Sequence, residues 1–249
     1  MMQLTLLGNG RVASFFKQLI EKSTALEWVG WYAREFRDET LPKGVQKVSQ
    51  IEDLPPADLH LVCVSDDALP IIVPKIQQKG IVAHTSGAVG LEVFQKQQTA
   101  GVFYPLQSFS KESLPKLADI PICIEADTAM TFSRLEAFAQ IIGLKSQAMY
   151  SQQRLQLHLA AVFANNFSNH CWTIAKELCE KSNISFDLLQ PLIENSFRKM
   201  QQIGPKAAQT GPALRKDQQT IEKHLNHLNP DLGELYQKLS DSIQNAHEL

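Results

Sequence analysis

The chain begins with an apolar stretch that runs into a glycine-rich turn, Leu4-Thr5-Leu6-Leu7-Gly8-Asn9-Gly10-Arg11-Val12-Ala13. A Gly-x-Gly-x-x-Ala pattern between a strand and a helix is typical of a turn that binds a dinucleotide pyrophosphate. The first glycine permits the tight turn, the second lets the backbone approach the phosphate, and the alanine lets the helix lie on the strand. Unpaired N–H groups at the helix start attract the anion. We therefore predict a cofactor site, with a purely structural turn as the alternative, at Gly8, Asn9, Gly10, Arg11 and Val12.

The end of the next apolar stretch, Trp28-Val29-Gly30-Trp31-Tyr32-Ala33-Arg34, bears on which dinucleotide binds. Chains that bind NAD usually carry Asp or Glu here to accept hydrogen bonds from the ribose 2′-hydroxyl. This chain has Arg34 instead, and a guanidinium suits the 2′-phosphate of NADP(H). The alternative is that Arg34 is a solvated loop charge beside Glu35.

Composition limits the function classes. The 249 residues are 44% hydrophobic and 20% charged, with a net charge of −2 that offers no attraction to nucleic acid. No apolar run has the length of a membrane span, and the N-terminus does not resemble a secretory signal. We expect a cytoplasmic protein without nucleic-acid or membrane partners. The four cysteines lack Cys-x-x-Cys spacing, so we expect buried free thiols and no metal site.

The pattern of hydrophobic residues changes near Ser151. Before it, apolar strands alternate with helical segments, as in 59–64, 81–84, 102–104, 120–124 and 144–150, with a helix at 129–142 and a short strand at 45–48. After it, long helical patterns occupy about 152–181, 185–202 and 217–247. We predict an α/β Rossmann-type parallel sheet over residues 1–150 as the NADP-binding domain, followed by an all-α substrate and dimerisation domain over 151–249.

Polar residues follow three of the predicted strands. Because ligands bind at the carboxyl ends of parallel strands, these residues are candidates for contact with cofactor or substrate. Ser65 and Asp66 are predicted to lie beside the dinucleotide. For His84 and Ser86, contact with a ligand and a purely structural turn are equally plausible, since serine and glycine are common turn residues. Gln107 and Ser108 follow the third strand amid aromatic residues, as a pocket wall would.

The first helix of the second half carries a polar stripe. His158, Val162, Asn165 and Asn169 share one helix face by their spacing, beside apolar residues. A histidine there could deliver the proton that accompanies hydride transfer to a carbonyl or imine, with Asn165 and Gln107 positioning the substrate. The alternative for His158 is a hydrogen-bonded structural histidine.

A second polar segment surrounds Thr210-Gly211-Pro212. Arg215 behind this turn could bind a substrate carboxylate or a cofactor phosphate. Equally, Asp217 could cap the last helical region and pair with a neighbour.

Together these motifs resemble a bacterial family whose members join a Rossmann-like NADP-binding domain to a helical C-terminal domain of unknown function. The resemblance rests on residues 8–12, 84–87, 104–110, 158–166 and 210–217. The family is similar in build to pyrroline-5-carboxylate reductases, ketopantoate reductases and β-hydroxyacid dehydrogenases. That likeness implies an NADP-dependent oxidoreductase that forms a homodimer through its helices.

The chain departs from the resemblance in two places. The hydroxyacid dehydrogenases and ketopantoate reductases place a catalytic lysine on the first long helix of the second half, where this chain has no lysine before Lys176. Lys216 stands where a glycine is expected between Arg215 and Asp217. The sequence hypothesis is an NADPH-dependent reductase of a small carbonyl or imine compound bound in an interdomain cleft. A dinucleotide-binding sensor or dimeric assembly module without turnover is the alternative.

Overall fold

The structure is a computed structural model that describes residues 1–36, 41–96, 98–110 and 120–247. The chain divides into two compact units, Met1–His170 and Cys171–Leu249.

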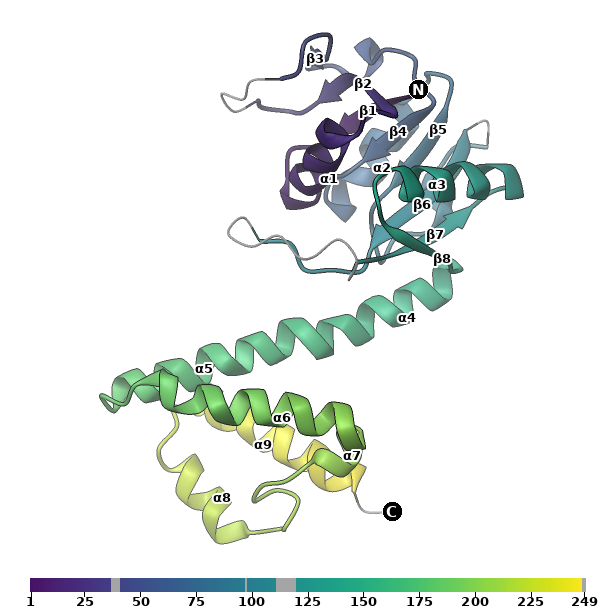
Figure 1. The fold of residues 1–249 in the computed structure, drawn as a ribbon. Coiled ribbons are helices and arrows are strands. Elements are labelled where there is room, and N and C mark those ends of the chain that lie inside the picture. Colours follow the sequence, from purple (N-terminus) through teal and green to yellow (C-terminus); the bar gives the residue numbers. More distant parts are fainter. Residues whose placement is uncertain (37–40, 97, 111–119, 248–249) are drawn as a thin grey trace. The chain divides into compact units, whose positions relative to one another are not determined.

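The first unit is built on one twisted sheet of eight strands (Figure 1). The strands are β1 (Met2–Leu7), β2 (Leu26–Tyr32), β3 (Gln46–Val48), β4 (Leu59–Val62), β5 (Ile81–His84), β6 (Thr99–Pro105), β7 (Pro121–Ala126) and β8 (Lys145–Ala148). Their order is β3-β2-β1-β4-β5-β6-β7-β8, and the first six follow the Rossmann order. Neighbouring strands are parallel except β6 and β7. The predicted fold class is therefore confirmed, with an antiparallel junction that the sequence did not indicate.

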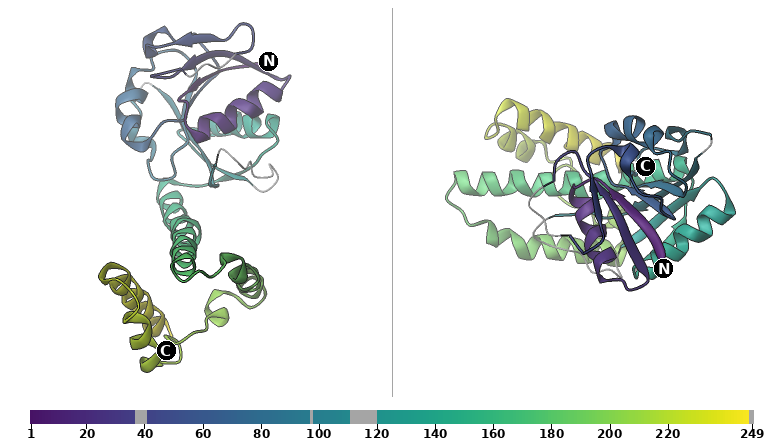
Figure 2. Two further views of the ribbon diagram at one scale, coloured as in Figure 1. Left: turned by 90° about the vertical axis from the view of Figure 1, so that its left-hand side faces the viewer. Right: turned by 90° about the horizontal axis from the view of Figure 1, so that it is seen from above.

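Helices cover both faces of this sheet. α1 (Arg11–Lys22) and α3 (Ala129–Ile141) pack their apolar sides against one face of the sheet. The core formed there includes Phe16, Phe103 and Phe138. The short helix α2 (Leu69–Ile72) packs on the other face, where Leu7 and Val62 lie. The left view of Figure 2 shows purple α1 and blue α2 on opposite sides of the strands. The covered faces explain why β1, β4 and β5 read as nearly continuous apolar runs.

All regular secondary structure that the structure describes after β8 is helical. α4 (Ser151–Ala161) continues through a π-helical segment, Val162–Phe167, into α5 (Ser168–Lys181). The later helices are α6 (Gln190–Ile203), α7 (Pro205–Ala208), α8 (Gln218–Leu225) and α9 (Pro230–Ala246). The helix predicted over 217–247 is thus wrong in one respect. It is interrupted because Asn229 caps a new helix that begins at Pro230.

The secondary structure changes from alternating strands and helices to helices at Ser151, and the compact units divide after His170. α4 belongs with the sheet because the side chain of Arg154 reaches Glu125 on β7. The cysteine prediction is correct for Cys63 and Cys123 and wrong for Cys171, which is exposed. No helix among the described residues has the length and apolar character needed to cross a membrane.

Candidate active site

The glycine turn after β1 is held on both sides by its neighbouring strands. Gly8 has a φ of 110°, and a Cβ placed on it would lie 2.2 Å from the carbonyl oxygen of Cys63. Its N–H donates to the oxygen of Tyr32, and its own oxygen accepts from the indole N–H of Trp31. No side chain larger than hydrogen fits this position. The tight turn expected from the sequence is therefore present.

The surroundings of Gly10 differ from those of Gly8. It lies directly before α1 with φ −75°, and a Cβ there would meet no atom within 4 Å. No side chain caps α1 and its first turn carries no acidic residue, so its first N–H groups and its dipole are available to an anion. The exposed Arg11 guanidinium lies 3.5 Å from the oxygen of Phe109, and Val12 is half-buried.

A cavity of about 190 Å³ opens beside this turn. Arg34 and Ser65 line it, together with the glycine turn and the ends of β2 and β4. The Asn9 amide donates to the oxygen of Glu35 at 2.7 Å and so ties the turn to the end of β2. Arg34 is exposed, and in the described part of the chain no carboxylate pairs with it. The glycine turn, the uncapped N-terminus of α1 and the nearby Arg34 guanidinium together fit a phosphorylated dinucleotide.

The turn after β5 is stabilised by its own side chains. His84 Nδ1 accepts from the N–H of Ser86, so Nε2 carries the proton and donates to the oxygen of Gly90 at 3.2 Å. Burial lowers the pKa of the His84 ring to about 4, which keeps it neutral. The Ser86 hydroxyl oxygen accepts from the N–H groups of Ala88 and Val89. This geometry favours the structural reading for both side chains, and their contact with a ligand stays a prediction.

Tyr104 and His158 meet at the end of β6. The tyrosine hydroxyl lies 3.1 Å from His158 Nδ1, and the rings meet edge to face. Both line a cavity of about 490 Å³. Three further residues of this cavity, Gln107, Ser108 and Asn165, were predicted site residues, as was His158. Asn166 also lines it, because the π-helical segment brings adjacent asparagines to this wall. Sequence reasoning missed Tyr104 and Asn166 as site residues.

A buried ion pair anchors the helix that carries His158. The Arg154 side chain is only 1% exposed; it pairs with Glu125 and donates to the oxygen of Val89 at 2.6 Å. Glu125 also accepts from the N–H and the hydroxyl of Ser151. Since Arg154 and His158 are one helical turn apart, this anchor sets which face of α4 meets the sheet.

The other predicted residues are not among those that line this cavity. Asp66 is exposed in the turn after β4. Arg215 belongs to the second unit, where its guanidinium lies 3.9 Å from Asp217. Asp217 caps α8, and hydrogen bonds from Thr220 hold its carboxyl pKa below its usual value. Lys216 has φ 55°, the left-handed conformation that a glycine would adopt without strain. A role for Arg215 in ligand binding stays a prediction.

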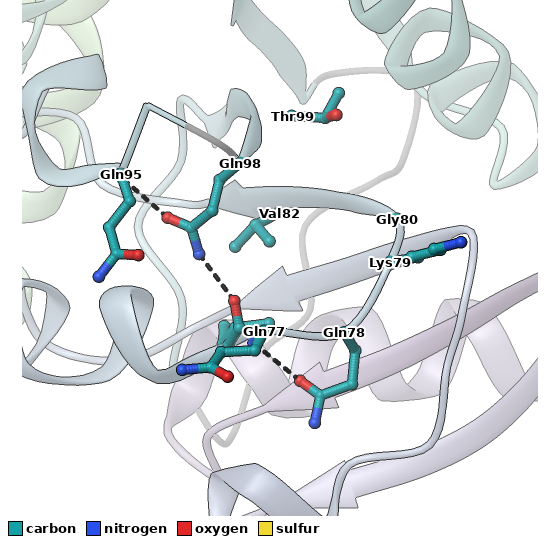
Figure 3. A pocket seen from close by; sticks show the side chains of 9 residues that line it. Gln77, Gln78, Lys79, Gly80, Val82, Gln95, Gln98 and Thr99 are labelled. Atoms are coloured by element: carbon teal, nitrogen blue, oxygen red, sulfur yellow. Dashed lines mark hydrogen bonds between the residues drawn. The ribbon is translucent and has the colours of Figure 1, made fainter.

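Another cavity of the first unit, about 510 Å³, lies at the opposite edge of the sheet (Figure 3). It is formed at the amino ends of β5 and β6 by glutamine side chains, among them Gln95 and Gln98. The Gln98 amide donates to the oxygens of Val73 and Ile76 and therefore has a structural role. Among its described lining residues only Lys79 is ionisable. The candidate active site is accordingly the carboxyl edge.

Comparison with known proteins gives a consistent result. The model of a family described as "Domain of unknown function (DUF2520)" matches residues 120–243. No curated protein matches the chain. A solved structure from Bacteroides fragilis, named a "putative NADP oxidoreductase", is 32% identical over 98% of both chains with a TM-score of 0.84.

More distant solved structures share the fold. A pyrroline carboxylate reductase from Plasmodium falciparum with NADP bound is 12% identical over 98% of both chains, with a TM-score of 0.58. A Streptomyces aurantiacus imine reductase is 14% identical over 98% of this chain and 93% of its own, with a TM-score of 0.63. At these identities the likeness extends to the fold alone.

Proposed function

Because this chain belongs to the DUF2520 family of Rossmann-like proteins with a helical C-terminal region, we propose that it is an NADP(H)-dependent oxidoreductase that reduces a small carbonyl or imine compound. The proposal rests on one observation. The glycine turn and the cavity with Tyr104 and His158 lie at the same carboxyl edge of the sheet. Ligands of doubly wound sheets bind along this edge.

The proposed roles follow from where each side chain lies. The start of α1 and the glycine turn hold the pyrophosphate, and the guanidinium of Arg34 holds the 2′-phosphate. When bound, the reduced nucleotide supplies a hydride. Gln107, Ser108 and Asn165 on the wall of the larger cavity orient the substrate, and His158 supplies a proton.

The test measures binding and turnover separately. NADPH and NADH are titrated against the protein by calorimetry, and NADPH oxidation is then followed with keto acids, aldehydes and cyclic imines. We expect saturable binding with a preference for NADPH and oxidation with at least one substrate class. Tight binding without oxidation across the panel would favour a dinucleotide sensor. Absence of saturable binding by either nucleotide would contradict both functions.

We also propose that the partner of the helical unit is a second copy of the chain. No described residue of α5 or α6 is buried, and Leu188, Leu192 and Phe197 are 72%, 60% and 56% exposed. Apolar side chains so exposed favour association, and an identical copy is always present at equal concentration.

Sedimentation velocity tests this association. Wild type is expected to sediment as a dimer, and Leu192→Asp as a monomer because a buried carboxylate opposes association. Met130→Asp is the control, since Met130 is an apolar residue of α3 in the first unit and is 76% exposed. A monomeric wild type, or a dimer that survives Leu192→Asp but not Met130→Asp, contradicts the proposal.

A further inference from the structure

Tyr104 makes a polar contact although it belongs to a hydrophobic cluster. It is the residue before the last of the buried strand β6, yet its hydroxyl is directed to His158 Nδ1 and it lines the 490 Å³ cavity. His158 is half-buried and lines the same cavity from α4. The pair therefore connects a buried hydroxyl to an imidazole that can exchange protons with water.

The turn after β5 touches both members of this pair. A Cβ on Gly87 would lie 2.7 Å from His158 Nδ1 and 2.8 Å from Cζ of Tyr104. This turn follows β5, which is separated from β1 and its glycine turn only by β4. Two strand spacings amount to about 10 Å. The Tyr104–His158 pair thus adjoins the part of the sheet edge along which a dinucleotide would extend.

We propose that Tyr104 is a catalytic residue that donates its hydroxyl proton to the substrate, and that His158 replaces this proton. The inference rests on the proposed function. The carbon of a C=O or C=N bond accepts the hydride of the reduced dinucleotide, and its oxygen or nitrogen takes the Tyr104 proton. The tyrosine oxygen takes the proton on His158 Nδ1, and His158 takes a proton from water at Nε2. Exchange with water, in which Nδ1 gains a proton and Nε2 loses one, then restores the starting tautomer. One hydride and one proton are consumed in each turnover.

The environment of Tyr104 gives the reason for a pair. Burial raises the pKa of its hydroxyl, with Cys123 and Asp66 adding to the effect and Arg154 opposing it. A tyrosine without this partner would form a phenolate only with a large unfavourable free energy, because burial disfavours the charged form. Simultaneous proton delivery from His158 avoids that charge, so each group depends on the other.

The anchor of α4 keeps the two groups in contact. Arg154 binds both Glu125 and the oxygen of Val89, so it joins the helix, β7 and the turn after β5 at one point. A donor pair held in this way needs little rearrangement when substrate binds.

The first test needs neither nucleotide nor substrate. Side-chain 15N NMR of the histidines is recorded for wild type and Tyr104→Phe, with His158→Asn used to assign the signal. We expect Tyr104→Phe to change the tautomer signature of His158 and to leave the His84 signal unchanged. A His158 signal that does not respond overturns the pairing.

The second test is kinetic, with a substrate found in the turnover panel. We expect Tyr104→Phe and His158→Asn each to lower kcat by roughly 10²- to 10⁴-fold while KM and NADPH affinity change little. The double variant should be no slower than the slower single variant, because residues that act as a unit are not additive. Independent, multiplying losses or an unchanged kcat in Tyr104→Phe overturn the relay.

A matched control exists in the second unit. Tyr236 and His224 form a similar pair, with the hydroxyl 2.9 Å from Nδ1 and the rings edge to face. Tyr236→Phe should alter the His224 signal and leave kcat unchanged. A wild type inactive on every substrate refutes the proposed function and the relay with it, while the apo NMR experiment still reports whether the pair exists.

Discussion

Removal of the buried guanidinium of Arg154 should destabilise the first unit strongly. Loss of one partner of a buried ion pair costs about 3 to 5 kcal/mol, because the other charge stays buried without compensation. In Arg154→Met the Glu125 carboxylate keeps its two hydrogen bonds from Ser151. We therefore expect a loss near the lower limit, about 3 kcal/mol.

Removal of the other partner, Glu125, should lower the free energy of unfolding by more than removal of Arg154. Glu125→Gln leaves a guanidinium that cannot lose its proton, at a site where the Arg154 side chain is almost fully buried and its Nε has no hydrogen-bond partner in the described residues. We expect about 4 to 5 kcal/mol. The double variant should lose about 1 to 3 kcal/mol less than the sum of the two, because the residues contact each other directly.

The assay is urea unfolding followed by tryptophan fluorescence. A Trp172→Phe background removes the exposed tryptophan of the second unit, so the buried Trp28 and Trp31 report on the first. Arg134→Met is the control, since its ion pair with Asp58 is 47% and 39% exposed and contributes at most about 1 kcal/mol. If Arg154→Met costs no more than this control, the anchoring role of the ion pair is refuted.

Further predictions concern single positions of both units. Gly8→Ala should lower the free energy of unfolding by about 2 kcal/mol or more, because its Cβ would collide with the backbone. Gly10→Ala should change the free energy of unfolding by no more than about 0.5 kcal/mol. Its methyl group should nevertheless obstruct the phosphate and weaken NADPH binding roughly tenfold, which calorimetry would reveal. Arg34→Ala should cost about 1.5 to 3 kcal/mol of NADPH affinity and little of NADH affinity, and equal losses would remove Arg34 from the 2′-phosphate. His84 should make stability fall as pH drops from 6.5 to about 4, since only the unfolded chain gains a proton there, and this slope should disappear in His84→Asn. Lys216→Gly should stabilise the second unit by up to about 1 kcal/mol in urea unfolding because it relieves a left-handed backbone, and a loss of stability would contradict that reason.

Features that depend on neighbouring residues were predictable from the sequence. The glycine turn, the buried strands and the helix over 129–142 each follow from local residue spacing. The capping role of Asp217 was among the alternatives for the same reason. Hydrophobic periodicity determines such elements before any tertiary contact forms.

Features that depend on distant contacts were not predictable. The direction of β7 against β6 is a property of how the chain returns to the sheet. Tyr104 and His158 are 54 positions apart, and no spacing rule joins a strand end to a helix face. The π-helical segment has no characteristic composition, so the wall that includes Asn166 was not foreseen. The break before Pro230 differs from these features, because the prediction missed it although the adjacent Asn229-Pro230 pair is a local start signal.

The π-helical segment also has an evolutionary consequence. A π turn holds one residue more than an α turn, so it can arise or vanish through insertion or deletion of a single codon. Such an event would rotate Asn165 and Asn166 by about 100° around the helix and leave Arg154, which precedes the segment, in its place. Relatives of this chain could therefore acquire a differently lined cavity in one genetic step while the anchored proton-donating pair is inherited unchanged.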